Sequence, residues 1–145
     1  MRNYRKVSAG FTLIEAIVVV AIVGIISAFA ISTYSGSIEK TRRADGKAAV
    51  LRAAAAQEKW YAQNNQYSAD MSVLGGTNSS EGYYTLAATN ALNGVACASR
   101  TCFTITATAT GAQASDTECG ILTVDNIGRK RSYRLGTTTE TQNCW

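Results

Sequence analysis

A single carboxylate interrupts a long apolar stretch near the N-terminus of this 145-residue chain. Between residues 11 and 31, which read FTLIEAIVVVAIVGIISAFAI, the one charged residue is Glu15. An ionised carboxylate inside an apolar helix costs about 2.5–3.5 kcal/mol on membrane-insertion scales, so it needs a partner or a role. A carboxylate beside a buried ammonium group costs far less than either charge alone. Alternatively, Thr12 and Glu15 form the T-x-x-E capping box of a helix N-terminus, where the helix dipole also favours a carboxylate.

Four cysteines lie in the second half of the chain: Cys97, Cys102, Cys119 and Cys144. Their spacings, C-x4-C and C-x24-C, lack the C-x2-C unit of zinc sites, and the chain has no histidine to complete a ligand set. We expect disulfides, in one of three pairings, on the oxidising side of a membrane. We favour Cys97–Cys102, which closes a short loop, and Cys119–Cys144, which ties the C-terminal end to a strand. Loop closure by the second pair would stabilise the fold by about 3–3.5 kcal/mol.

The stretch RKRSYR at residues 129–134 is the candidate site for an anionic partner. Its four cations are Arg129, Lys130, Arg131 and Arg134. Lysine and arginine contacts with phosphates supply most non-specific affinity for DNA, and Tyr133 is interleaved among them. Two alternatives stay open: the stretch is a solvated hairpin beside a turn, or it faces acidic residues of a neighbouring subunit.

We do not expect an enzyme. The chain contains no histidine, so neither a Ser-His nor a Cys-His nucleophilic pair can be built. No Gly-rich phosphate loop and no clustered carboxylate pair is present either. A Ser-Lys arrangement stays open, but nothing in the sequence points to one. We therefore predict no catalytic residue, no cofactor and no metal site.

The net charge of +4 is concentrated at the N-terminus. Arg2, Arg5 and Lys6 contribute three of these charges, whereas the chain from residue 65 onward holds five basic and six acidic residues. The overall charge therefore does not by itself indicate nucleic-acid binding. Basic residues before an apolar helix predict an N-terminus kept in the cytoplasm and a translocated C-terminal domain.

Two kinds of processing compete at the N-terminus. The first is cleavage of a secretory signal peptide after the A-x-A pattern at 28–30, although the apolar run is long for that type and begins with a charge. The second is a cut between Gly10 and Phe11, which leaves the apolar helix on the mature protein. The motif GFTLIE at residues 10–15, followed by an apolar helix, favours the second because it resembles the prepilin signature of the type IV pilin family.

The resemblance implies a role for each residue of this motif. Gly10 would precede the bond cut by a prepilin peptidase, and Phe11 would become the N-methylated first residue. Glu15 would pair with the N-terminal amine of a neighbouring subunit. Residues 1–10 would be a leader peptide, and residues 11–31 a helix long enough to cross about 30 Å of hydrocarbon and later to form the filament core.

An amphipathic continuation of the helix is predicted over residues 32–64. Apolar residues at spacings of three, four and six define the face expected to pack on the rest of the domain: Tyr34, Ile38, Ala44, Ala48, Leu51, Ala55 and Tyr61. Charged side chains are expected on the opposite, solvated face: Glu39, Lys40, Arg42, Arg43, Asp45, Lys47, Arg52, Glu58 and Lys59.

The region 65–145 is predicted to be a globular antiparallel β domain. Strands are expected at 83–89, 102–110, 120–125 and 129–134, with a turn at 125–128. Such a sheet needs a cover for its apolar face, which the amphipathic helix can supply. The sequence thus predicts an α+β protein with the type IV pilin fold: a long N-terminal helix packed on an antiparallel sheet of about four strands, with a disulfide-closed C-terminal region.

Two further stretches resemble the PilE-type minor pilins of this family. They are QEKWYAQNNQYS at 57–68 and GAQASDTECGILTVDNIGRKRS at 111–132, the latter with a closing Cys144-Trp145. The expected function is a structural subunit of a type IV pilus, a minor pilin that enters or primes a fibre for motility, adhesion or DNA uptake. The alternatives are a major pilin, a DNA- or ligand-binding pilin that uses residues 129–134, and a type II secretion pseudopilin.

The resemblance also implies partners and a location. The partners would be other pilin subunits, the inner membrane before assembly, a prepilin peptidase, the pilus assembly platform and, in the ligand-binding alternative, DNA or a surface ligand. The protein would cross the bacterial inner membrane once, with its N-terminus in the cytoplasm, before assembly. Afterwards it would belong to an extracellular pilus.

Overall fold

The computed structural model describes residues 10–145, apart from the side chains of residues 29–33 and 35. The first nine residues of the predicted leader, with Arg2, Arg5 and Lys6, lie outside the described residues. The chain divides into two compact units, one that ends at Ser37 and one over Ile38–Trp145. Helix α1 (Leu13–Asn64) contributes residues to both units and ends where the amphipathic pattern predicts.

The first unit contains the beginning of α1. Thr12 caps this helix: its Oγ1 accepts a hydrogen bond from the backbone nitrogen of Glu15 at 3.3 Å, which is one of the two hydrogen bonds of a capping box. The large apolar side chains that the structure describes in this part are not covered by the rest of the chain. Their exposed fractions run from 84% for Phe11 to 48% for Val18. Among the residues that the structure describes, no helix combines the length and the apolar character needed to cross a membrane. The predicted span 11–31 includes residues 29–31, whose side chains are outside that set.

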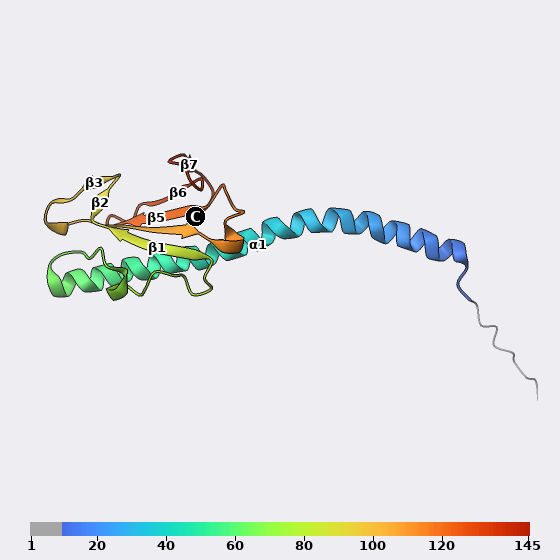
Figure 1. The fold of residues 1–145 in the computed structure, drawn as a ribbon, viewed down its shortest axis with the longest axis horizontal. Coiled ribbons are helices and arrows are strands. Elements are labelled where there is room, and N and C mark those ends of the chain that lie inside the picture. The colour runs from blue at the N-terminus through green and yellow to red at the C-terminus, as the bar shows by residue number, and fades with distance from the viewer. Residues whose placement is uncertain (1–9) are drawn as a thin grey trace, which may run out of the picture. The chain divides into compact units, whose positions relative to one another are not determined.

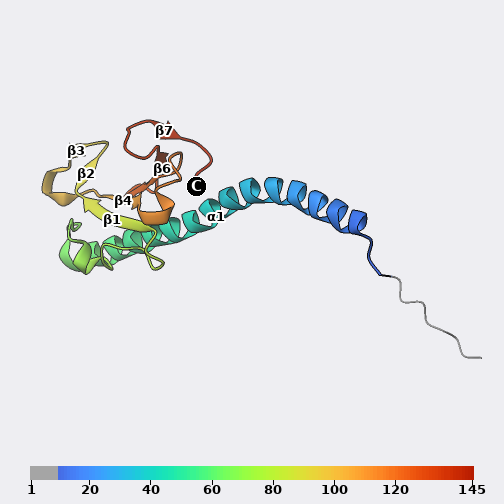
Figure 2. The ribbon, with the colours of Figure 1, turned by 45° about the vertical axis from the view of Figure 1, so that its right-hand side comes forward.

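The second unit is an α+β domain in which α1 covers one face of an antiparallel sheet (Figures 1 and 2). The strand order is β1-β4-β5-β6-β7. The strands of this sheet are β1 (Tyr84–Thr89), β4 (Thr104–Ala109), β5 (Ile121–Asp125), β6 (Lys130–Tyr133) and β7 (Glu140–Thr141). A separate hairpin consists of β2 (Ala91–Leu92) and β3 (Val95–Ala96), and 3-10 helices occupy Met71–Val73, Ala98–Arg100 and Gly111–Gln113.

The predicted fold class is therefore the observed one, with more strands than the predicted four. β1, β4, β5 and β6 correspond to the four predicted strands. β2, β3 and β7 have no counterpart among the predicted strands, because two residues each are too few to show an alternating pattern.

The core lies between α1 and the inner face of the sheet. Alternate residues of β1 and β4 are buried, and the register pairs Leu86 with Ala107 and Ala88 with Ile105. Most of the bulk comes from the sheet side, where Tyr84, Phe103, Ile105 and Leu122 are among the largest fully buried side chains. Large residues on the sheet allow small residues on the helix, so that the two layers approach closely.

The face of α1 that meets the sheet is not the predicted one. Its buried positions are Gly46, Ala49, Val50, Ala53 and Gln57. Several residues assigned to the packing face are exposed instead: Tyr34, Ala44, Ala48, Leu51, Ala55 and Tyr61. Alanines occupy several sides of the helix between residues 48 and 56, so the apolar period is ambiguous there. The true face also contains a polar residue, Gln57, whose amide exchanges hydrogen bonds of 2.5 and 2.9 Å with the backbone of Ser68.

Candidate functional site

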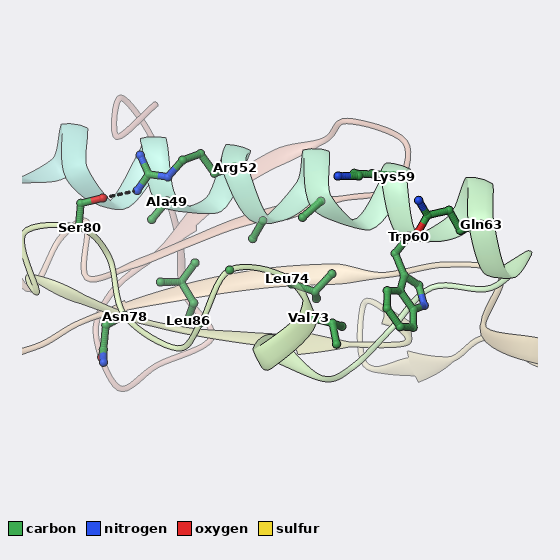
Figure 3. A pocket seen from close by; sticks show the side chains of 14 residues that line it. Ala49, Arg52, Lys59, Trp60, Gln63, Val73, Leu74, Asn78, Ser80 and Leu86 are labelled. Atoms are coloured by element: carbon green, nitrogen blue, oxygen red, sulfur yellow. Dashed lines mark hydrogen bonds between the residues drawn. The ribbon is translucent and has the colours of Figure 1, made fainter.

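A groove with a volume of about 590 Å³ runs between α1 and the segment that follows Met71–Val73 (Figure 3). On the helix side its lining residues recur every third or fourth position: Arg52, Ala56, Lys59 and Gln63. This spacing places them on one face of the helix. The opposite wall contains Gly75, Gly76, Asn78 and Ser80.

This helix–loop groove carries positive charge. Arg52 and Lys59 line it, and no carboxylate belongs to the described residues of its wall. The guanidinium of Arg52 is oriented toward the loop, because its Nη2 donates a hydrogen bond of 2.8 Å to Oγ of Ser80. The half-buried indole of Trp60 points from the helix toward the loop (Figure 3). The groove thus offers two cations, an aromatic ring and polar side chains on both walls.

The spacing of the two cations suits a polyphosphate. Arg52 and Lys59 are seven residues apart on α1, which corresponds to about 10.5 Å at 1.5 Å per residue. One strand of B-DNA presents a phosphate about every 3.4 Å along its axis, so this separation corresponds to about three intervals between successive phosphates. The helix pattern predicts a solvated face for both residues, because a helix sequence alone does not show that a loop lies opposite.

The four cations predicted at residues 129–134 do not form one surface. Arg129 and Arg131 line a second groove, on the face of the sheet away from α1. Lys130 instead lies 5.5 Å from the ring centroid of Trp145, a residue that packs against the core. Arg134 lies beside Glu118, with 2.6 Å between Nη2 and Oε1. Successive residues of a strand point to opposite faces, and this alternation divides the stretch.

Partners within the chain also engage the two outer arginines. Nε of Arg129 lies 2.7 Å from Oδ2 of Asp125. Arg131 donates a hydrogen bond to the side chain of Asn93 in the β2–β3 hairpin. Each of the four predicted cations therefore has a carboxylate, an amide or an aromatic ring beside it.

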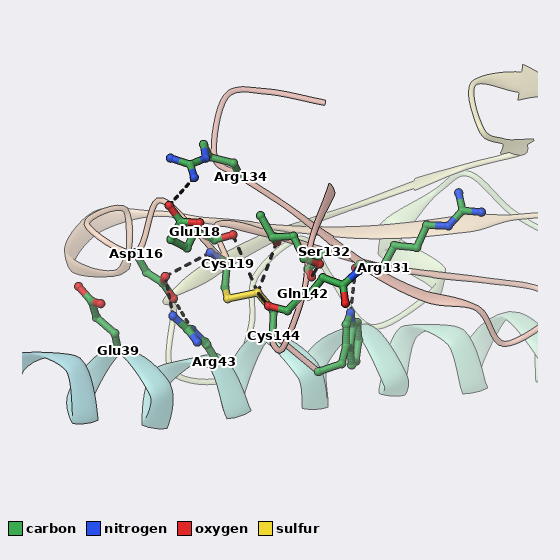
Figure 4. Close-up of a disulfide and its surroundings, with 12 residues drawn as sticks. Glu39, Arg43, Asp116, Glu118, Cys119, Arg131, Ser132, Arg134, Gln142 and Cys144 are labelled. Carbon is green, nitrogen blue, oxygen red and sulfur yellow. Dashed lines mark hydrogen bonds and ion pairs between the residues drawn. A yellow bond between two sulfur atoms is a disulfide. The ribbon is translucent and has the colours of Figure 1, made fainter. Parts of the chain in front are cut away.

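A buried polar cluster joins α1 to the segment that precedes β5 (Figure 4). Nε and Nη2 of Arg43 donate to the two carboxylate oxygens of Asp116 at 2.5 and 2.8 Å. Asp116 is nearly inaccessible, and it also accepts from the backbone nitrogen of Cys119 at 3.2 Å and from Gln113 at 3.0 Å. The hydrogen bond to Asp116 raises the pKa of Arg43, against the opposing effect of desolvation. This cluster fixes the approach to β5 and leaves no charge available to a ligand.

Both disulfides lie in the second unit. Cys97 is joined to Cys102 ahead of β4, and Cys119 to Cys144 at the C-terminal end (Figure 4). These are the two pairs that the sequence favours. The second disulfide connects the residue next to Gly120 and β5 with the penultimate residue, so the chain after β6 is held against the sheet.

The residues of the N-terminal motif are accessible. Gly10, Phe11 and Glu15 are all exposed, and Glu15 lies in the first turn of α1. Glu15 forms no ion pair with a described residue of its own chain. The roles implied for these residues in processing and assembly stay predictions.

Comparison with known proteins identifies the class and then the family. The prokaryotic N-terminal methylation motif matches residues 5–31, which places the chain in the class of proteins that carry this motif. The family model described as "Type IV minor pilin ComP, DNA uptake sequence receptor" matches residues 32–123. Because this match covers more than half of the chain, the protein belongs to this family of type IV minor pilins.

Individual relatives show a more restricted similarity. The chain is 48% identical over 42 residues to the type IV major fimbrial protein FimA of Dichelobacter nodosus, which is 29% of this chain and 26% of that protein. A fimbrial protein of the same organism matches to the same extent. The chain spans about a quarter of the length of these curated relatives. A type IV pilin from Shewanella oneidensis is 25% identical, with a TM-score of 0.48 over 74% of this chain and 97% of that one.

Proposed function

We propose that this minor pilin binds DNA through the helix–loop groove. The description of its family as a DNA uptake sequence receptor carries the proposal. The groove supports it because Arg52 and Lys59 stand there without a carboxylate among the described lining residues. The stretch 129–134 supports it less, since its cations are divided between two faces and are engaged within the chain.

The affinity contributed by the groove is expected to depend on salt. Each phosphate neutralised by a lysine or arginine releases condensed counterions and lowers the slope of log K against log salt by about 0.9. Two contacts therefore account for a slope of about −1.8. The ring of Trp60 can stack on a base, an interaction worth about 1–3 kcal/mol per base in proteins that bind single strands.

A fluorescence titration of the detergent-solubilised full-length chain with labelled duplex DNA, at several salt concentrations, tests this proposal. The double variant Arg52→Gln/Lys59→Gln is expected to bind DNA more weakly. The slope of its log K against log salt should be shallower than that of the wild type by about 1.8. Lys40→Gln is the matched control, because Lys40 is an exposed cation of the same helix that lines neither groove. If Arg129→Gln with Arg131→Gln abolished binding while the Arg52 and Lys59 variants bound normally, the contact would lie at residues 129–131 and the assignment to the helix–loop groove would be wrong.

We also propose that residues 11–31 hold the chain in the inner membrane, with a cytoplasmic N-terminus, until the pilus assembly platform moves it into the fibre. The single charge in these 21 residues and the basic residues before them support this stage. The role requires no catalytic chemistry. In cells that lack the assembly platform, the chain should resist alkaline carbonate extraction from membranes. Its release into the soluble fraction would exclude a membrane-held precursor.

A further inference from the structure

The second groove lies on the outer face of the sheet and has a volume of about 940 Å³. Its floor is formed by β4, β5 and β6. The β2–β3 hairpin contributes Asn93 and Gly94 to one side, and residues 137, 138 and 140 contribute to another. Sites for small ligands have volumes of about 300–1,000 Å³, so this outer groove is large enough for one. Walls above the sheet distinguish it from an ordinary solvated strand face.

The charges of the outer groove cancel. Arg129 and Arg131 are matched by Asp125 and Glu140 among the lining residues. Asp125 is buried and is used fully by its own turn: Oδ2 faces Arg129, and Oδ1 accepts from the backbone nitrogens of Ile127 and Arg129 at 3.1 and 3.0 Å. A polyanion such as DNA gains little net attraction from such a surface. An uncharged ligand can bind there without an opposite charge of its own, because the charged side chains of the groove already neutralise one another.

Hydroxyl groups supply most of the remaining polar lining: Thr89, Thr104, Thr106, Thr123, Thr137 and Thr138. A hydroxyl both donates and accepts hydrogen bonds. Thr104, Thr123 and Thr137 donate to backbone carbonyls, of Ala91 at 2.6 Å, Arg131 at 3.4 Å and Arg134 at 3.2 Å, so their oxygens remain only as acceptors. The bond from Thr104 ties the hairpin to β4, and the oxygen of Thr137 also accepts from the backbone nitrogen of Thr139. Arg131 can only donate, and its hydrogen bond with Tyr133 raises its pKa.

An apolar patch lies beside these polar groups. Tyr133 on β6 is directly opposite Ile121 on β5, and both residues line the groove. A tyrosine ring offers a flat apolar face together with a polar hydroxyl. The ligand that fits this combination has no charge, has hydroxyls that donate and accept, and has a C–H face that can cover a ring. We propose that the outer groove binds a neutral saccharide.

This site is separate from the helix–loop groove, so the two proposals can fail independently. The full-length chain, in a zwitterionic detergent without a sugar headgroup, can be titrated with glucose, galactose, N-acetylglucosamine, lactose and galactose 6-sulfate. Calorimetry and ligand-observed saturation-transfer NMR would detect binding. We expect saturable binding of at least one neutral sugar at or below about 10 mM. We also expect no gain in affinity for the sulfated one.

Two substitutions locate the site. Tyr133→Leu removes the aromatic ring, and Thr106→Arg fills the floor of the groove; each should weaken binding about tenfold or more. Thr85→Val is the matched control, because Thr85 is exposed on edge strand β1 and does not line the groove. Arg52→Gln should leave sugar binding unchanged.

The proposal is overturned if no neutral sugar binds, if the sulfated sugar binds more tightly, or if the Tyr133 and Thr106 variants bind like the wild type. Thermal unfolding of each variant shows whether it is folded. Thr106→Val replaces Thr106→Arg if the larger residue unfolds the chain, and it should still weaken binding by removing one hydroxyl.

Discussion

Replacing Gly46 with alanine should destabilise the second unit, although alanine is the better helix former. Gly46 lies within α1 and is buried against the ring of Tyr84. A Cβ atom at this position would be 2.8 Å from Cδ2 and Cε2 of Tyr84 and 2.9 Å from Cζ. The ring has little freedom to withdraw, because Tyr84 is fully buried and its hydroxyl accepts from Gln113 at 3.4 Å.

Steric overpacking and helix propensity have opposite effects on the stability of the Gly46→Ala variant. Overpacking a well-packed core costs about 1–3 kcal/mol, and three ring atoms in simultaneous close contact place this site in the upper half of that range. Alanine recovers about 1 kcal/mol of helix propensity relative to glycine. The net loss is then about 1–2 kcal/mol, which corresponds to a melting temperature lower by about 5–10 °C in a domain of this size.

Thermal unfolding followed by near-ultraviolet circular dichroism measures this loss. Gly36→Ala is the control, because Gly36 lies in the same helix and has nothing within 4 Å of the added atom. In a Tyr84→Leu background the penalty of Gly46→Ala should disappear, since the ring that causes it is gone. A higher melting temperature for Gly46→Ala in the wild-type background would refute the reasoning, because propensity would then outweigh the contact.

Three other perturbations have defined outcomes. Burial raises the pKa of Tyr84 to about 12, so its contribution to stability is complete below pH 10, where the unfolded chain is also protonated, and is lost as the pH rises toward 12. Urea unfolding between about pH 10 and 12 should therefore show a decline in the free energy of unfolding of up to about 1.4 kcal/mol per pH unit, and this decline should be smaller in Tyr84→Phe. Replacing Cys119 and Cys144 with serine should lower the free energy of unfolding by about 3.5 kcal/mol, against about 2 kcal/mol for Cys97 and Cys102, because the sequence separations are 25 and 5. Equal losses in urea titrations would contradict this loop-closure estimate. Glu15→Gln should leave cleavage after Gly10 intact but reduce the amount of the chain in sheared pili on immunoblots, and unchanged incorporation would show that assembly does not require this carboxylate.

The sequence predicts elements well where one local pattern dominates. The strict alternation of threonine with apolar residues predicts β4, and the Asn64-Asn65 pair predicts the end of α1. The prediction of which face of α1 packs on the sheet was wrong, because alanine is compatible with every side of a helix. Local patterns also fail to show contacts between distant residues. Arg43 is half-buried because it pairs with Asp116, which is 73 residues away in the chain.

The candidate sites were harder to predict for two different reasons. The helix–loop groove brings residues 49–63 together with 73–80, and no local pattern reports that proximity. The division of residues 129–134, in contrast, could have been foreseen. Once that stretch is assigned to a strand, its period of two already places Arg129 and Arg131 on one face and Lys130 on the other.

The availability of a cation, more than its presence, decides where this domain can meet an anion. Arg43 and Arg52 lie on the same helix, yet Arg43 is neutralised by a buried carboxylate and Arg52 is oriented by a neutral hydroxyl. The same contrast separates the two grooves. In the outer groove Arg129 faces Asp125, whereas no described carboxylate lines the helix–loop groove, which contains Lys59. Removing the neutralising group should therefore change ligand preference more than adding a cation would. Asp125→Asn would free Arg129 and should make the outer groove attract anions, with a salt dependence that the wild-type groove lacks.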